Sequence, residues 1–376
     1  MYRFRIIVPD SDRIRYGVPL TEALTTDLEP NMVYFVSANN VLKVEIPSLD
    51  PSTLSADRES PIIKLSATYV ASFKYPIQSI CSRRYSDESK GYLCGMDERG
   101  HIKVFESDLN GNLILKKEFR HKGDSSSLLE ESWCLLRFSP SGKYLLSMHA
   151  LSSSVNIYSF ENQMNDPIVI HTVGHPNSVC WRDDETIIVT EQKQLSQFSI
   201  KGKECVCFNR ITVGANNVTC LCAFTTSDSV VACTETDRGV FGMNSQNLKI
   251  VKRWKAPIRS SVTGCIAEKT LSKFYGCEVE VVYLCGDDNE VLLFKNSGKE
   301  EKESALRERH SINIRSRSRI IGMTLSPLNG SSYLFVLGQN GDLDVIENPC
   351  DFLIERRKHK LNSYGEHEDK RMVVEE

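Results

Sequence analysis

Hydrophobic and polar residues follow one repeated pattern along almost the whole chain: an apolar run, a short polar turn and a second run that alternates. The two copies that agree best are YLCGMDERGHIKVFES at 92–107 and YLCGDDNEVLLFKN at 283–296. Alternation of apolar and polar residues is typical of a half-buried β-strand, and an acidic or Gly-containing turn favours a tight connection. Each copy is therefore predicted to be a β-hairpin. The seven copies cover residues 32–47, 92–107, 144–160, 186–200, 229–244, 281–296 and 333–348.

The spacing of these hairpins predicts the architecture. From the last run of one copy to the last run of the next, the chain advances by 60, 53, 40, 43, 53 and 52 residues. A period of roughly 40–50 residues with several strands in each unit is the signature of a β-propeller. An inner strand precedes the hairpin, best seen in ESWCLLRFSPSGKYLL at 131–146. Candidate outer strands follow it at 62–70, 113–121, 167–173, 204–212 and 248–254.

The N-terminal stretch MYRFRIIVP has no partner of its own, whereas the seventh unit has no outer strand. We predict that the two pair and close the ring, because an open ring would expose sheet edges that invite aggregation. The prediction is thus an all-β fold, a seven-bladed β-propeller closed by the N-terminal strand. An eight-bladed ring remains compatible with the same pattern.

Two segments resemble the WD40-repeat family in a divergent form. LLRFSPSGKYLLSM is similar to that family's inner strand, turn and second strand, and GHPNSVCW at 174–181 is similar to its Gly-His element followed by an inner strand. No unit ends in Trp-Asp; Phe105-Glu106 and Ile346-Glu347 stand at two of these places. The resemblance covers residues 1 to about 350. It implies a propeller that binds proteins or short peptides, without most of the family's buried Asp-His-Ser/Trp hydrogen-bond network. Another propeller family remains an alternative.

Composition describes an ordinary soluble chain. The 376 residues carry a formal net charge of −3 with pI near 6.3, which does not suggest a general polyanion binder. No run approaches the roughly 18 apolar residues of a membrane span, and no signal peptide is recognised. Thirteen cysteines, many inside strand-like runs, fit free buried thiols in a reducing compartment. We expect an intracellular protein, nuclear or cytoplasmic, with one propeller domain at 1–350 and a polar tail at 351–376.

A search for reactive chemistry finds no constellation that predicts an enzyme. Phosphate-binding glycine loops, nucleophile elbows and His-rich metal arrays are all missing from the sequence. Cys205-Val-Cys207 and Cys220-Leu-Cys222 place pairs of thiols on one face of a strand, but zinc sites normally use a wider spacing. They are interpreted as core thiols in adjacent strands. No catalytic residue, cofactor or metal is therefore expected.

Two basic segments are the candidate interaction residues. Residues 314–320 read IRSRSRI, which places Arg315, Arg317 and Arg319 on one face of an extended strand. The alternative is a solvated outer strand of blade six, following a polar insertion at about 297–312 between blades six and seven. In the tail, Arg356, Arg357 and Lys358 form a basic run that fits a nuclear-import signal or a disordered terminus.

The sequence therefore favours a non-catalytic scaffold, a propeller subunit of an intracellular multiprotein complex whose partners are proteins or peptides, with no membrane insertion. The first alternative is a propeller that binds RNA or another polyanion through Arg315–Arg319 and the basic tail. The second is an enzyme whose site lies in the central channel, which requires convergent polar side chains there.

Overall fold

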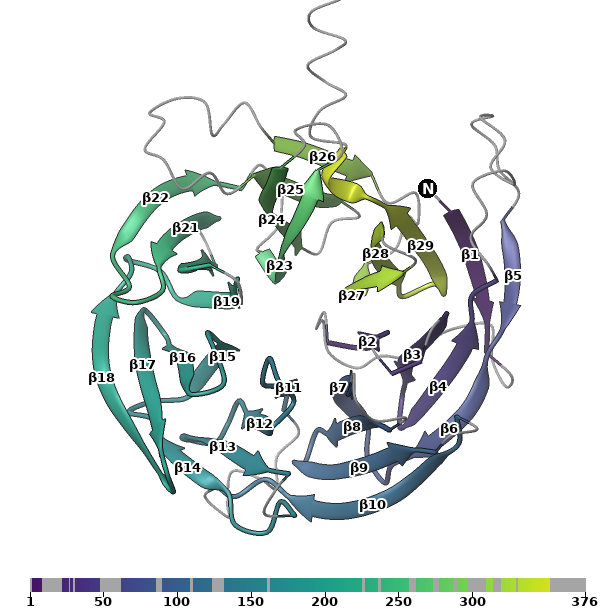
Figure 1. Ribbon diagram of the computed structural model, residues 1–376, viewed down its shortest axis with the longest axis horizontal. Helices are drawn as coiled ribbons and strands as arrows, with labels where there is room; N and C mark the ends of the chain where they lie inside the picture. Colours follow the sequence, from purple (N-terminus) through teal and green to yellow (C-terminus); the bar gives the residue numbers. More distant parts are fainter. Residues whose placement is uncertain are drawn as a thin grey trace, which may run out of the picture.

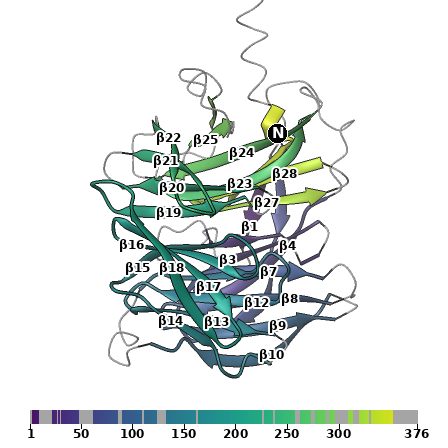
Figure 2. The same cartoon turned by 60° about the vertical axis from the view of Figure 1, so that its left-hand side comes forward.

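Seven β-sheets stand around a central axis as the blades of a ring in the computed structural model of the chain (Figures 1 and 2). The described residues are 2–8, 22–26, 28–29, 31–47, 62–85, 90–108, 111–123, 132–160, 163–224, 227–235, 238–256, 262–272, 277–286, 290–295, 309–313, 319–328 and 331–351. Within these ranges the only helical element is the short 3-10 turn η4 (Pro349–Asp351). The predicted seven-bladed, all-β fold is confirmed.

Each blade is a meander that runs from the central axis outwards, so its first strand lies innermost (Figure 1). Blades one to three contain β2 (Leu24–Thr25), β3 (Met32–Ser37), β4 (Asn40–Glu45) and β6 (Thr68–Ser72); β7 (Ile77–Arg84), β8 (Gly91–Asp97), β9 (His101–Ser107) and β10 (Leu113–Arg120); and β11 (Cys134–Phe138), β12 (Tyr144–His149), β13 (Ser154–Ser159) and β14 (Ile168–His171). Blades four and five contain β15 (Pro176–Trp181), β16 (Thr186–Glu191), β17 (Gln194–Lys201) and β18 (Glu204–Thr212); and β19 (Val218–Ala223), β20 (Ser229–Thr234), β21 (Gly239–Asn244) and β22 (Ile250–Lys255). Blade six contains β23 (Val262–Ser272), β24 (Cys277–Gly286), β25 (Glu290–Lys295) and β26 (Arg309–Asn313), and blade seven contains β27 (Ile320–Leu328), β28 (Ser331–Gly338), β29 (Asp342–Glu347), β1 (Tyr2–Ile7) and β5 (Ile63–Ser66).

The ring closes through the N-terminal strand, as predicted. Strand β1 pairs antiparallel with β29, with Arg5 opposite Asp342, and these two side chains form an ion pair. Phe4 and Ile6 point into the core between blades seven and one. The first and last parts of the chain thus share one sheet, which leaves no gap between the first and last blades.

A second connection across the closure was not predicted. The stretch 62–70 was expected to be one outer strand of the first unit, but the structure divides it at the buried Ala67. Ile63–Ser66 forms β5 and pairs in parallel with β1, whereas Thr68–Ser72 forms β6 and pairs with β4. The backbone N–H of Ala67 donates to the carbonyl of Ile7 at 3.0 Å. One continuous segment therefore belongs to both the last and the first blade.

The core consists of seven hydrophobic clusters, each of which lies between two neighbouring blades. The cluster between blades one and two contains Tyr34, Phe73 and Ile80, for example, and that between blades six and seven contains Tyr283 and Val336. Alternating side chains of a strand face opposite sides of its sheet, so each blade contributes to two clusters. This is why the predicted hairpins are apolar at almost every position in their central strands.

A buried hydrogen-bond network centred on His121 lies between blades two and three. The sequence analysis expected most of the buried Asp-His-Ser/Trp network of the WD40-repeat family to be missing, and this histidine and serine network resembles part of it. Asn156 Nδ2 donates to His121 Nδ1 at 3.1 Å, and Ser147 Oγ lies 2.8 Å from the same nitrogen. Because Ser154 Oγ donates to the carbonyl of Lys122, its oxygen is left to accept from His121 Nε2 at 3.4 Å. These contacts describe a neutral imidazole protonated on Nε2. Burial is the larger cause and the charge of His149 the smaller one, and together they lower the pKa of His121 to about 3.

Candidate functional site

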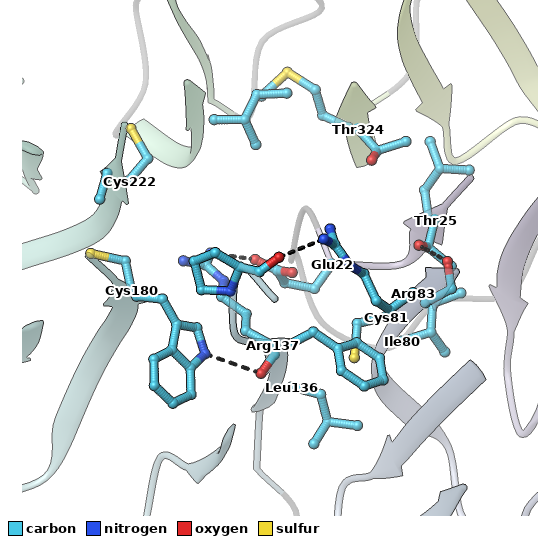
Figure 3. A pocket seen from close by; sticks show the side chains of 18 of the residues that line it. Glu22, Thr25, Ile80, Cys81, Arg83, Leu136, Arg137, Cys180, Cys222 and Thr324 are labelled. Carbon is cyan, nitrogen blue, oxygen red and sulfur yellow. Dashed lines mark hydrogen bonds and ion pairs between the residues drawn. The ribbon is translucent and has the colours of Figure 1, made fainter. Parts of the chain in front are cut away.

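A cavity of about 320 Å³ opens on the central axis of the ring, where the innermost strands of all seven blades meet (Figure 3). Its charged lining groups are Glu22, Arg83 and Arg137, and smaller polar groups come from Thr25, Ser82, Ser139 and Thr324. Each blade contributes residues of its innermost strand, or residues next to that strand, to the lining. The cavity is the place where residues far apart in the sequence come together.

Arg137, on β11 of blade three, ties several blades together across the axis. Its Nη2 lies 2.7 Å from Glu22 Oε1, and its Nη1 donates to the carbonyl of Val179 at 2.7 Å and to that of Leu221 at 3.3 Å. Burial lowers the pKa of Arg137, but the Glu22 carboxylate more than offsets this and the pKa is raised overall. The guanidinium is therefore a permanent positive charge beside the cavity, connected to blades one, four and five.

Glu22 is held at the axis by its backbone. It forms a bridge with Gly322 of blade seven, and its carbonyl accepts from the N–H of Ile80 in blade two at 3.0 Å. A Cβ on Gly322 would stand 2.5 Å from the Cβ of Leu24, so only glycine permits this close approach. The absence of a side chain on one strand thus positions the carboxylate that pairs with Arg137.

Arg83, on β7, reaches the turn of the next blade. Its Nη2 donates to the carbonyl of Pro140 at 2.5 Å, and Tyr85 Oη donates to the carbonyl of Gly142 at 2.6 Å. This turn is the Ser-Pro-Ser-Gly element expected from the sequence, in which Gly142 takes a φ of +83°. Arg83 Nε is buried and has no hydrogen-bond partner among the described residues. The Arg83 guanidinium is one of the charged groups of the cavity lining.

Thiols line part of the wall. Cys180 and Cys222 lie on one side of the cavity, opposite Thr25, and Cys81 lies lower in the same view (Figure 3). Burial raises the pKa of Cys180 to about 12, although the charge of Arg137 lowers it. Burial is also the largest cause of the raised pKa of Cys81. The thiols of Cys180 and Cys81 are therefore protonated at neutral pH and are poor nucleophiles.

The polar side chains of the cavity are bonded mainly to one another. Thr25 Oγ1 and Ser82 Oγ lie 2.6 Å apart, and Glu22 is paired with Arg137. The Ser139 hydroxyl hydrogen-bonds to the Asp184 carboxylate, and the charge of Glu22 adds to the raised pKa of Cys81, after burial and the neighbouring Cys94. The polar groups that converge at the axis thus form a network that connects the blades.

Known proteins were compared with the chain at three levels. No protein-family model matches the sequence, and no curated protein sequence matches it either. Among solved structures, Sqt1 from Chaetomium thermophilum, in a crystal structure with the N-terminus of the ribosomal protein L10, superposes with a TM-score of 0.58. The alignment covers 86% of this chain and 83% of that one at 13% identity. At this identity the likeness concerns the fold.

The fold is that of a seven-bladed β-propeller, as the resemblance to the WD40-repeat family implied. The repeated hairpins and the closing N-terminal strand carry this assignment. No helix within the described ranges is long and apolar enough to cross a membrane.

Of the six basic residues that the sequence analysis proposed as interaction residues, the structure describes only Arg319, and Arg319 does not line the cavity. Arg315, Arg317 and the tail residues Arg356, Arg357 and Lys358 lie outside the described residues. Arg319 is half-buried, directly before β27, and its carbonyl accepts from the N–H of Gln339 at 2.9 Å. The interaction role of this group stays a prediction.

The outer strand of blade six differs from the expected one. It is β26 (Arg309–Asn313), which pairs with β25 from Glu290 opposite Asn313 to Phe294 opposite Arg309. Residues 309–312 were expected to belong to an insertion between blades six and seven, and 314–320 was the alternative outer strand. The intervening residues 296–308 lie outside the described residues and connect the third and fourth strands of one blade.

The C-x-C pairs also lie differently from the interpretation given above. Cys205 and Cys207 lie on β18, the outermost strand of blade four, where Cys207 is exposed. Cys220 and Cys222 lie on β19, the innermost strand of blade five, and both are buried. The two pairs are therefore on opposite sides of the propeller wall, and the interpretation of adjacent strands is wrong. Sequence reasoning also missed Glu22 and Arg137, which no local motif marks.

Proposed function

We propose that the chain is a non-catalytic interaction platform that holds a segment of a partner protein at the mouth of its central cavity. The observation that carries the proposal is the cavity itself, an opening to which all seven inner strands contribute and whose polar groups form a connecting network. The blades form a rigid support. Residues at the mouth of the cavity and in the loops between strands lie outside the cores between blades, so they can serve binding without weakening those cores. The more general part of the proposal, that the propeller binds protein, is based on the fold.

The solved structure of Sqt1 supports a peptide-like partner. That protein was crystallised with the N-terminus of a ribosomal protein, and the fold similarity extends over 86% of the present chain. An extended segment is the kind of ligand that enters a narrow opening of about 320 Å³ without rearrangement of the ring. By this reasoning the partner of the present chain is a terminal or loop segment of another protein.

The charge of the lining indicates what such a segment carries. Glu22 neutralises Arg137, so Arg83 is the remaining charged group of the lining. An arginine binds a carboxylate through charge-assisted hydrogen bonds. We infer an acidic side chain, or a C-terminal carboxylate, at the point of the partner segment that enters the cavity.

The setting proposed for this platform is an intracellular multiprotein complex, in the nucleus or the cytoplasm. The support is the composition of the chain, with thirteen cysteines and a polar C-terminal tail that contains a basic run. The tail residues Arg356, Arg357 and Lys358 would then act as an import signal.

The test fills the cavity without touching its hydrogen bonds. Ala223 is a half-buried residue of the cavity wall that also packs against the core between blades four and five, so Ala223→Trp enlarges the side chain at the wall of the opening. Thr68→Trp, on the exposed outer strand β6, is the matched control with the same added side chain. Tagged versions of both variants and of the wild type are purified from the source cells, with and without nuclease, and the associated proteins are quantified by mass spectrometry.

Stoichiometric proteins that survive nuclease, remain with Thr68→Trp and are lost with Ala223→Trp would support the proposal. A photo-crosslinking amino acid at position 223 would then mark the partner segment. Partners that remain with Ala223→Trp would refute the cavity as their site. Loss of all associated proteins on nuclease treatment would instead favour the polyanion alternative through Arg315–Arg319 and the tail.

A further inference from the structure

Three cysteine sulfurs converge inside the wall between blades five and six. The Sγ atoms of Cys220, Cys233 and Cys265 all lie within 4.8 Å of one another. The residues come from three strands, β19, β20 and β23, that belong to two blades. The three cysteines are 13 and 32 residues apart along the chain, so they form no short metal-binding motif in the sequence.

The repeated geometry of the inner strands explains the convergence. Most inner strands contain a β-bulge near their start, and the residue that follows it points to the next blade. In blades two and four this residue is Ser79 or Ser178, whose hydroxyl accepts from the N–H of Leu136 or Leu221 in the following blade. In blade five the corresponding residue is Cys220. Its sulfur therefore faces blade six.

The remaining two sulfurs are placed by register. Cys220 is directly opposite Cys233 in the antiparallel pair β19–β20, so their side chains lie on the same face of blade five. In blade six, Gly264 is the residue after the bulge and Cys265 follows it, as Leu221 follows Cys220. Leu221 lies opposite the Ser178 side chain of the preceding blade, and Cys265 has the equivalent position opposite the Cys220 side chain.

The surroundings combine exclusion of water with access from the cavity. The exposed fractions of Cys220, Cys233 and Cys265 are 6%, 0% and 4%, and apolar side chains such as Phe294 pack around them. Cys265 also lines the central cavity, together with the neighbouring Cys222. An ion that enters the cavity from solvent can therefore reach a sulfur of the group without unfolding the wall, and an entry path is a requirement for a metal site.

The spacing of the sulfurs fits a metal ion with three thiolate ligands. With metal–sulfur bonds of about 2.3 Å, a planar three-sulfur site needs sulfurs about 4 Å apart. Separations of at most 4.8 Å reach this value with side-chain shifts of a few tenths of an ångström. The sulfur of Cys222 does not lie within 4.8 Å of all three of these sulfurs. The arrangement therefore offers three sulfur ligands and not the four of a tetrahedral site.

We propose that Cys220, Cys233 and Cys265 form a binding site for one copper(I) ion in the wall between blades five and six. Soft thiolate ligands select soft ions, and zinc in structural sites is almost always four-coordinate. On binding, the three thiols give up their protons to solvent and the ion joins three thiolates, with a net charge of −2. The guanidinium of Arg137 donates to the carbonyl of Leu221, between Cys220 and Cys222, but it is already paired with the Glu22 carboxylate and does not balance this charge.

The site is tested on the full-length, reduced protein under anaerobic conditions, with copper(I) supplied from a bathocuproine disulfonate complex as competing chelator. The expected result is one copper(I) ion per chain, withdrawn from the chelator. X-ray absorption of the loaded wild-type protein should show three sulfurs at about 2.3 Å. This measurement needs no variant and gives the ligand count directly.

Variants then assign the ligands. Cys265→Ala should weaken copper(I) binding by more than the roughly 10–100-fold that loss of an outer-shell partner costs. Cys134→Ala is the matched control, since Cys134 is equally buried but lies between blades two and three. Copper(I) binding that is equal in wild type and Cys265→Ala, a two-sulfur spectrum, or preferred binding of zinc with four sulfurs would each overturn the proposal. A disulfide between Cys220 and Cys233 as the sole product of the reaction would overturn it too.

Discussion

His121 makes the stability of the propeller dependent on pH in a way that one substitution should remove. Its ring is buried between blades two and three, protonated on Nε2 and held at Nδ1 by the Asn156 amide. Protonation of Nδ1 would bring an N–H against that amide donor and place a charge in the core. His121→Gln keeps hydrogen-bonding atoms at this position but cannot take up a proton.

The size of the effect follows from the pKa difference between the two states. The pKa of His121 is about 6.5 in the unfolded chain and about 3 in the folded protein. Between these values the unfolded state binds more protons, so this contribution to stability is complete above about pH 6.5 and is lost as the pH falls. Linkage gives a loss of about 2 kcal/mol between about pH 7.5 and about pH 5 from this residue alone.

The assay is urea unfolding followed by tryptophan fluorescence at a series of pH values, for wild type, His121→Gln and the control His171→Gln. His171 is exposed at the end of β14, so its variant should follow the wild type. Other titrating groups are common to all three proteins and cancel in the differences. The advantage of wild type over His121→Gln should shrink by about 2 kcal/mol over this pH range. Parallel curves would show that His121 is not a buried neutral histidine.

Three further predictions concern the contacts that join the blades, each measured as the change in the free energy of unfolding. Arg137→Ala should cost about 2–4 kcal/mol, since it leaves the Glu22 carboxylate unpaired, and adding Glu22→Gln should recover part of that loss; additive effects would contradict the pairing. Phe4→Ala should cost about 3–5 kcal/mol, because Phe4 is 1% exposed in the core at the ring closure; a cost under about 1 kcal/mol would argue that β1 does not close the ring. Gly322→Ala should cost about 1–3 kcal/mol because the added methyl meets Leu24, and a neutral result would mean that the blades separate easily there.

The main strands could be predicted because their signals are local. Alternation in 92–107 or 333–348 needs only neighbouring residues, and the spacing of seven such hairpins leaves few architectures other than a propeller. The prediction failed where a strand signal continued from one blade into another. The stretch 62–70 alternates throughout, and nothing within it shows that Ala67 passes from one blade to another.

The sequence by itself determined the repeated hairpins and the strand that closes the ring, and it favoured seven blades, because periodicity and turn residues act over short distances along the chain. Only the tertiary structure decided what meets at the centre. Glu22 and Arg137 are 115 residues apart and come together because the ring places every inner strand at one axis. Cys220, Cys233 and Cys265 converge because bulge, register and blade order act together. Such contacts depend on the path of the whole backbone, which no short segment of the sequence encodes.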